Sequence, residues 1–482
     1  MAHSPASEPG DLQKGLRQRH LTMIAIGGVI GAGLFVGSGA IIGEVGPAAF
    51  LTYAITGVLI VMVMRMLGEM AAADPSTGSF ADYARQSLGG WAGFSVGWLY
   101  WYFWVIVLAV EAAAGAAIIQ EWLPGVPIWA SSLILMLALT ATNLVSVRSF
   151  GEFEFWFASI KVAAIVAFIV IAIGYVVTGG GVSQLTAGGG FMPKGGAAIL
   201  SGIVIVIFAF VGAEIATIAA AESDEPGQSV RKATNSVVVR VLTFYVLSVF
   251  LIVAILPWNS AELGKSPFAA ALDEIGIPAA AQVMNAVVLT AVLSCLNSGL
   301  YVASRMNFAL ARRGDAPQWM VRLNGRGVPA RAILIASSIG FLSVIANVIS
   351  PEKVFLFLLN SSGAVALFVY LLICVSQLVL RRRLEREDPE RLEVRMWLYP
   401  YLTLFTIAAI VVVIGSMAFV GDVRSQLWLG LLSVGVVLAA YFVKRSVSQD
   451  AGGDAGLGGS TVSGRFSTRE DRERDQTVEA LQ

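Results

Sequence analysis

The sequence is poor in the residues from which soluble folds and catalytic or metal centres are built. Only 13% of its 482 residues are charged, whereas soluble domains contain about 25%. It has two histidines, His3 and His20, and its two cysteines, Cys295 and Cys374, lie in apolar segments. We therefore expect no disulfide, no metal site and no histidine-based catalysis. The net charge is zero, so nothing suggests a nucleic acid partner.

Signals for secretion and for cofactor chemistry are missing as well. Residues 1–19 are polar and do not form a cleavable signal peptide. We find neither a nucleotide-binding glycine loop nor a histidine and cysteine cluster. These absences argue against a membrane enzyme, and we expect no cofactor.

Long apolar runs fill the sequence instead. Hydrophobic residues make up 57% of the chain, and the runs recur at roughly 20 residues, the length that crosses a bilayer. We therefore predict an all-α polytopic membrane protein in contact with lipid. The twelve predicted spans are residues 20–42, 47–70, 91–121, 128–147, 153–177, 197–221, 236–256, 279–311, 332–348, 354–380, 397–420 and 426–443.

The distribution of lysine and arginine predicts the orientation of these spans. With the N-terminus inside, the outer loops hold only Lys194, Lys265, Lys353 and Arg424, four of 32 basic residues. Both termini are therefore expected in the cytoplasm. We divide the chain into a polar leader (1–19), a membrane domain (20–445) and a disordered tail (446–482) rich in glycine, serine and charge.

The first span contains a glycine cluster, Gly27 to Phe35, with four glycines in seven residues. Each glycine inside a helix costs about 1 kcal/mol relative to alanine, so a continuous helix is not expected. An interruption in the bilayer must face protein or a water-filled cavity, where its free N–H groups suit an anion. The cluster predicts a mid-membrane site that grips a carboxylate. The alternative is a close contact between helices through small residues.

A second interruption is predicted in span six, where Gly212 and Glu214 lie in Phe208-Ala209-Phe210-Val211-Gly212-Ala213-Glu214-Ile215. Spans one and six are the first members of two blocks of five. Paired breaks at matching positions indicate an inverted-repeat transporter with its site near the midplane.

Three ionisable side chains lie within the predicted spans: Glu111 in span three, Lys161 in span five and Glu214 in span six. Charges inside a membrane are expensive and usually functional. Burial disfavours the charged form of each, so each could load and release a proton. The alternative for each is a buried ion pair that fixes helix packing, or a side chain that reaches the interface. For Lys161 the pairing candidates are Glu152 and Glu154.

These residues resemble a known family. The glycine cluster, the pattern from Val45-Gly46-Pro47 to Gly68-Glu69 with Pro75 beyond it, and Phe-Val-Gly-Ala-Glu at 210–214 are similar to bacterial amino acid permeases of the amino acid–polyamine–organocation superfamily. The resemblance runs from about Leu16 to Val443 and is closest to permeases for 4-aminobutyrate (GABA). The supporting stretches are residues 97–101, 152–156, 294–298, 312–317, 361–364 and 396–400.

The resemblance implies a leucine-transporter-like fold of two inverted five-helix repeats, with helices one and six broken. Repeat one would cover about 20–177 and repeat two about 197–380, followed by two further helices at about 397–443. It also implies a symporter in the bacterial inner membrane that imports an amino acid with protons by alternating access.

The resemblance also implies a binding site. Backbone amides of the first break would hold the substrate carboxylate, and carbonyls of the second break its amino group. The amide residues are Ile30, Gly31, Ala32 and Gly33, and the carbonyl residues are Phe208, Ala209 and Phe210. An aromatic side chain closes over the substrate, with Phe208 as the candidate gate and Phe210 as the alternative.

Proton coupling is implied for Lys161, which takes the place of a sodium ion in sodium-coupled relatives. Glu111, Glu152 and Glu214 are further candidates for coupling. We count Glu111, Gly212 and Glu214 among the candidate substrate contacts.

Several alternatives stay open. The substrate could be proline, an aromatic amino acid or another zwitterion, and transport could be exchange rather than symport. From another class, a membrane-bound amino acid sensor would need a folded soluble output domain, and no inner loop is long enough to hold one. The sequence does not determine the oligomeric state.

Overall fold

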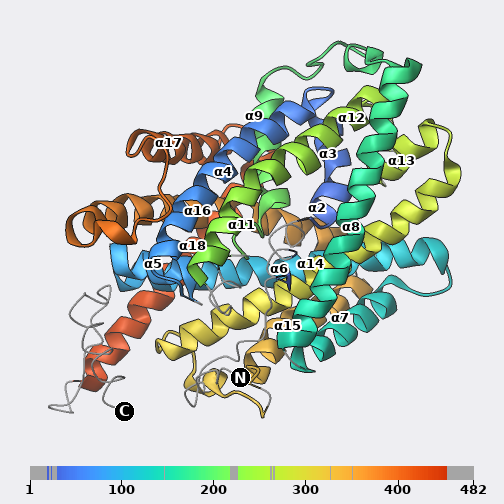
Figure 1. The fold of residues 1–482 in the computed structure, drawn as a ribbon. Helices are drawn as coiled ribbons and strands as arrows, with labels where there is room; N and C mark the ends of the chain where they lie inside the picture. Colours follow the sequence, from blue (N-terminus) through green and yellow to red (C-terminus); the bar gives the residue numbers. More distant parts are fainter. Residues whose placement is uncertain are drawn as a thin grey trace, which may run out of the picture.

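The computed structural model describes residues 19–20, 23, 30–76, 78–145, 147–215, 217, 226–260, 263, 266–325, 327–349 and 351–452. Within these ranges the chain forms helices and connecting turns and contains no strand, in agreement with the predicted all-α class (Figure 1). The leader apart from Arg19, the residues Gly27, Gly28 and Val29 of the glycine cluster, and the tail from 453 onward lie outside the described residues.

The helices follow the predicted spans. The first comprises α2 (Ala32–Phe35) and α3 (Gly37–Val45), and the sixth is α9 (Ala197–Phe210). The seventh combines α11 (Pro226–Arg240), a π-helical turn (Val241–Leu247) and α12 (Ser248–Ile255). The others are α4 (Ala49–Ala73), α6 (Gly90–Trp122), α7 (Ile128–Val145), α8 (Val147–Tyr175), α14 (Pro278–Arg312), α15 (Ala330–Ile349), α16 (Pro351–Glu387), α17 (Tyr401–Ser416) and α18 (Gly421–Gly452). Two short helices, α5 (Ser79–Leu88) and α13 (Pro267–Glu274), lie between them.

Eight helical segments in the described part are long and apolar enough to cross a membrane, and four shorter apolar helices match predicted spans one, six, nine and eleven. The apolar helices of spans one and six are short within the described residues, because α2 begins at Ala32 and α9 ends at Phe210. At the other end of the chain, α18 continues to Gly452, seven residues beyond the expected end of the membrane domain at 445.

Helices α6 and α14 form the centre of the molecule and run antiparallel. Their glycines allow close approach: a Cβ atom on Gly299 of α14 would lie 2.8 Å from Leu108 and 2.9 Å from Trp104 of α6. Gly115 of α6 faces Val292 of α14 in the same way. Close packing through small residues is the usual way to join membrane helices. It brings Glu111 of α6 and Cys295 of α14 to the same level of the molecule.

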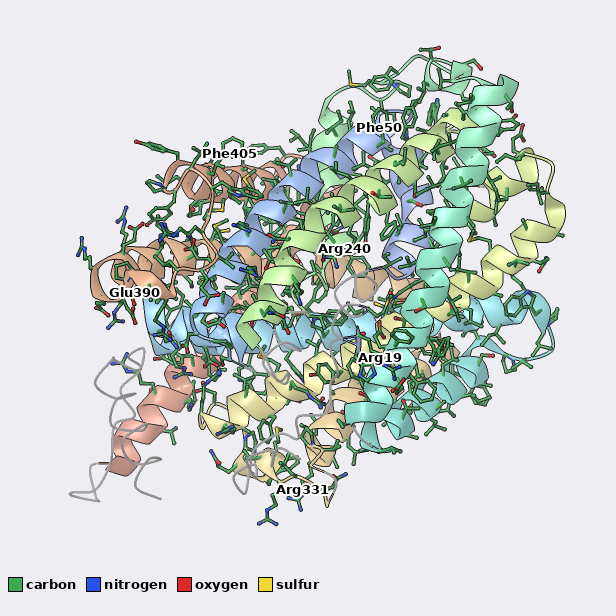
Figure 2. The ribbon with its side chains drawn as sticks, viewed as in Figure 1. Arg19, Phe50, Arg240, Arg331, Glu390 and Phe405 are labelled. Atoms are coloured by element: carbon green, nitrogen blue, oxygen red, sulfur yellow. The ribbon has the colours of Figure 1, made fainter. Side chains whose placement is uncertain are left out.

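The outer surface is apolar where the long helices face outward. Trp156, Phe405 and Trp428 are each more than half exposed, and Figure 2 shows Phe405 on α17 pointing away from the body of the protein. In α14, 78% of the most apolar stretch is buried, against 17% in α18, so α14 is central and α18 peripheral. An apolar surface of this extent fits contact with lipid hydrocarbon.

Candidate functional site

The first break is formed at Gly31. Its backbone is extended (φ −128°, ψ −156°), and helix α2 begins directly after it at Ala32. A side chain has little room here, because a Cβ atom on Gly31 would lie 2.8 Å from Oε1 of Glu111 and 3.0 Å from Sγ of Cys295. Glycine therefore lets α6 and α14 approach the backbone directly before α2.

The second break follows α9. Helix α9 ends at Phe210, Val211 is extended (ψ 138°), and Gly212 has φ +111°, a conformation that L side chains rarely adopt. The N–H of Gly212 donates to both carboxylate oxygens of Glu214 at 3.1 Å. The glycine predicted to interrupt span six thus lies at the point where the backbone turns out of the helix.

Glu214 holds this break to two neighbouring helices. Its Oε1 accepts a hydrogen bond from the hydroxyl of Tyr100 on α6 (2.8 Å), and its Oε2 accepts one from Tyr370 on α16 (3.2 Å). The side chain is fully buried. Because both oxygens already have donors, the structure places Glu214 as a brace of the break, and its role in substrate binding or proton coupling stays a prediction.

The two breaks touch each other at Gly33. A Cβ atom on Gly33 would lie 2.9 Å from the Cα of Ala209, so hydrogen is the only side chain that fits without movement. The carbonyl of Ala209 accepts a hydrogen bond from the hydroxyl of Tyr245 at 3.2 Å. One of the three carbonyls expected to hold an amino group is therefore already in use.

Lys161 lies at the first break, and its role in coupling stays a prediction. Its Nζ donates to the carbonyl of Ile30 (2.9 Å) and to Oγ of Ser294 (2.7 Å). The Ser294 hydroxyl in turn donates to Oε1 of Glu154 at 2.6 Å. Lys161, Ser294 and Glu154 are all fully buried. An ammonium group, a hydroxyl and a carboxylate thus connect the first break to α8 and α14.

Glu152 lies apart from this cluster. It is one-third exposed and pairs with Arg19 at 2.5 Å and His20 at 3.3 Å. Successive residues of a helix do not share a face, and Glu152 precedes Glu154 by two positions. Of the two carboxylates considered as partners of Lys161, the structure joins Glu154 to it, through Ser294.

Glu111 faces the first break from α6. Its carboxyl group accepts a hydrogen bond from the backbone N–H of Ala32 and contacts the thiol of Cys295. The side chain is 1% exposed, and its Oε2 has no hydrogen-bond partner among the described residues. Glu111 therefore occupies one of the amides that we expect to bind a substrate carboxylate.

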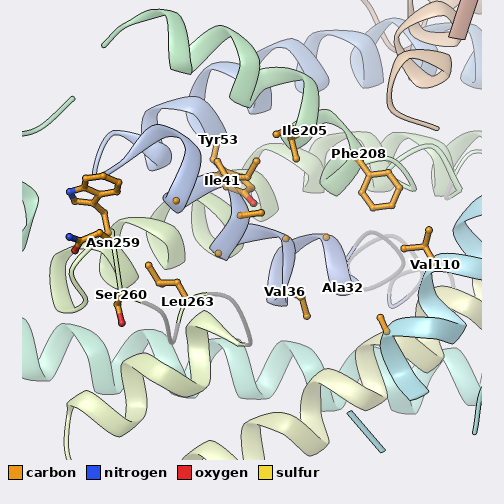
Figure 3. A pocket seen from close by; sticks show the side chains of 17 residues that line it. Ala32, Val36, Ile41, Tyr53, Val110, Ile205, Phe208, Asn259, Ser260 and Leu263 are labelled. Carbon is orange, nitrogen blue, oxygen red and sulfur yellow. The ribbon is translucent and has the colours of Figure 1, made fainter. Parts of the chain in front are cut away.

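A cavity of about 490 Å³ lies beside the two breaks (Figure 3). Ala32, Gly33 and Phe208 line it, whereas Ile30 and Gly31 do not. Figure 3 shows Phe208 and Val110 near one end of the cavity and Asn259 and Ser260 at the other. The rest of the lining is Val36, Gly37, Gly39, Ala40, Ile41, Gly43, Tyr53, Ala114, Ile205, Trp258 and Leu263.

The two aromatic gate candidates occupy different places. Phe208 lines the cavity and is partly exposed. Phe210 is 1% exposed and packs its ring against Tyr245, with centroids 4.4 Å apart, and against Tyr53 at 6.1 Å. The positions favour Phe208 as the side chain that could move over a ligand.

The predicted site residues do not include four side chains that hold the breaks in place: Ser294, Tyr100, Tyr245 and Tyr370. For Ser294 a signal exists: with Asn297 and Ser298 it forms a polar stripe at helical spacing along an otherwise apolar span. The tyrosines carry no such signal, because a tyrosine in a membrane helix packs its ring whether or not its hydroxyl has a partner.

Comparison with known proteins gives a consistent result. A sequence profile of the amino acid permease family matches residues 20–450. The chain is 54% identical to the gamma-aminobutyric acid permease of Bacillus subtilis, over 91% of this chain and 96% of the relative. It is 48% identical to the permease of the same name from Escherichia coli, with 91% and 96% covered. It is 41% identical to an aromatic amino acid transport protein of Corynebacterium glutamicum, with 90% and 95% covered.

Among solved structures, the fold is similar to that of a mutant manganese transporter from Eremococcus coleocola. The TM-score is 0.57 over 90% of this chain and 94% of that chain, at 14% sequence identity. This likeness supports the helical architecture alone.

The hydroxyl of Ser294 should stabilise the protein. Ser294→Ala leaves Glu154 and one donor position of Lys161 without a partner, and each buried polar group left unpaired costs about 1–3 kcal/mol. We expect a clear fall in the midpoint of thermal unfolding in detergent. The matched control is Ser376→Ala on α16, because the buried Ser376 hydroxyl has no partner among the described residues. If both variants unfold at the same temperature, Ser294 is not a stabilising link.

Proposed function

The chain belongs to the amino acid permease family, and we propose that it is a proton-coupled secondary active transporter that imports GABA, or a closely related amino acid, by alternating access. Permeases move a substrate without changing it covalently, so membership of the family places the chain among transporters and not enzymes. The observation that carries the GABA assignment is the 54% identity to the B. subtilis relative over nearly the whole chain.

We propose twelve membrane crossings arranged as two inverted repeats of five, at about 20–177 and 197–380, with two additional helices. Breaks at Gly31 and Gly212, in the first span of each repeat, support this arrangement. The few basic residues in the outer loops support cytoplasmic termini in the bacterial plasma membrane. On this view 1–19 is a leader and the residues beyond the last span form a cytoplasmic tail.

We assign the substrate carboxylate to the amides of Ile30 to Gly33 and the amino group to the carbonyls of Phe208 to Phe210, next to the turn at Gly212. Ala32, Gly33 and Phe208 already face the cavity. The amide of Ala32 is held by Glu111, so substrate binding would displace that carboxyl group. Exchange of one carboxylate for another at a single N–H preserves its hydrogen bond.

Lys161 is our candidate for the coupling group. When charged, it holds the carbonyl of Ile30 at the first break, as the 2.9 Å contact suggests. When neutral, it would release that carbonyl and let the inner side open. The proton is then linked to the conformational change because it stabilises one of two states more than the other.

Other substrates remain candidates. The 41% identity to an aromatic amino acid transport protein supports an aromatic amino acid as the second candidate substrate. Exchange of one amino acid for another is compatible with the same site.

Purified protein in empty liposomes should take up labelled GABA when the only driving force is a pH gradient that is acidic outside. Symport needs no amino acid inside, whereas exchange does. Uptake that requires an internal amino acid would refute symport and leave the site assignment intact. Competition by proline, phenylalanine and tyrosine tests the substrate: if any of them displaces the label far better than unlabelled GABA does, the GABA assignment is wrong.

Lys161→Met should abolish accumulation driven by a pH gradient, because methionine fills similar volume but carries no proton. Binding of GABA to the purified variant is the control for folding. If Lys161→Met still accumulates substrate against its gradient, with only the pH gradient supplied, then Lys161 is a structural residue.

Glu111→Gln should slow uptake and flatten its pH dependence. Glutamine keeps the shape of the side chain and its bond to the N–H of Ala32, but it cannot lose a proton. The readout is the initial rate of uptake across a range of pH. A variant with the rate and pH profile of the wild type would assign Glu111 to packing.

A further inference from the structure

Tyr53 on α4 is a buried polar residue whose hydroxyl is unpaired in the described part of the chain. It is 0% exposed, and its hydroxyl has no hydrogen-bond partner among the described residues. Its ring is well fixed, against Phe210 at 6.1 Å and Tyr245 at 6.2 Å between centroids. A buried hydroxyl without a partner costs about 1–3 kcal/mol, and a phenylalanine would fill the same space without that cost.

Tyr53 borders the cavity beside the two breaks. Tyr53 belongs to the lining of the 490 Å³ cavity, and Figure 3 shows it on the wall between Ile41 and Ile205, toward Phe208. The lining is otherwise mainly aliphatic and glycine, with Asn259 and Ser260 at the far end. A ligand in the cavity would therefore meet one polar side chain between the two ends.

The carbonyls of the second break are partly engaged, and a substrate ammonium group has three donors, so it can make a further hydrogen bond outside the break. The carbonyl of Ala209 already accepts the hydroxyl of Tyr245, and the backbone of Gly33 lies directly against Ala209. The free space lies in the cavity beside α2 and α3. With the carboxylate at the first break, an amino group separated from it by several carbons would extend into that space, whereas the amino group of an α-amino acid would stay close to the carboxylate.

We propose that the hydroxyl of Tyr53 accepts a hydrogen bond from the amino group of the substrate and thereby selects amino acids whose amine is remote from the carboxylate. The inference rests on the proposed function and adds to it a residue that measures the distance between the two charged ends. A phenolic oxygen can accept while its own proton points elsewhere, and a bond to a charged group is stronger than one to a neutral group.

Tyr53→Phe removes one oxygen atom and tests the assignment with two isomers, 4-aminobutyrate and 2-aminobutyrate, which differ only in the position of the amine. We expect the Kd for 4-aminobutyrate to rise about tenfold and the competition constant for 2-aminobutyrate to change less than about twofold. The midpoint of thermal unfolding should stay the same or rise, because an unpaired hydroxyl is lost.

The matched control is Tyr83→Phe. Tyr83 is equally buried, but its hydroxyl donates to the carbonyl of Asp74 at 2.7 Å and lies outside the cavity lining. This variant should lose stability and keep the affinity of the wild type for both isomers.

Three results would overturn the inference: unchanged affinity of Tyr53→Phe for 4-aminobutyrate, equal losses for both isomers, or a fall in unfolding temperature as large as that of Tyr83→Phe. Failure of the proposed function is visible separately in the wild type. If the wild type binds neither isomer, the GABA assignment and the inference fall together. If the wild type binds 4-aminobutyrate and Tyr53→Phe binds it with the same affinity, the inference alone is wrong.

Discussion

The hydrogen bond from Lys161 to the carbonyl of Ile30 is the contact on which the site depends. Where backbone leaves a helix in the middle of a bilayer, each freed N–H and carbonyl must find a partner inside the protein. A lysine buried next to Ser294 and Glu154 supplies that partner at the first break. On our proposal, the group that completes the first break is also the one whose charge state is coupled to transport.

At both breaks a carboxylate accepts a hydrogen bond from a free backbone N–H group. Glu111 reaches the N–H of Ala32 from α6, and Glu214 reaches the N–H of Gly212 from within its own break. The two differ in their surroundings. Tyrosine hydroxyls from α6 and α16 hold Glu214, whereas Glu111 has an oxygen without a partner in the described part of the chain. Glu214 fits a fixed brace, and Glu111 fits a group that can be exchanged.

The sequence predicts those features that depend on residues close together in the chain, namely the helices and their interruptions. Apolar runs predicted the helical segments, glycine density predicted the interruption at Gly31, and the pair of Gly212 and Glu214 predicted the one in span six. Ionisable residues in apolar spans pointed to Lys161 and Glu111. Partners across helices were not predictable, because Ser294 and Tyr245 meet their acceptors only after the helices pack. Glu152 and Glu154 look equivalent in sequence, yet their opposite faces on α8 send one to Arg19 and the other to Ser294.

The contact between Gly33 and Ala209 has a consequence for motion. Two backbones that touch without a side chain between them cannot approach further, and no flexible group absorbs a displacement. Movement of one broken helix toward the other would therefore displace the other helix. This contact does not hinder sliding or separation of the two helices. If the first and sixth spans rock during transport, this contact would be their pivot, and any residue larger than glycine at 33 would shift it.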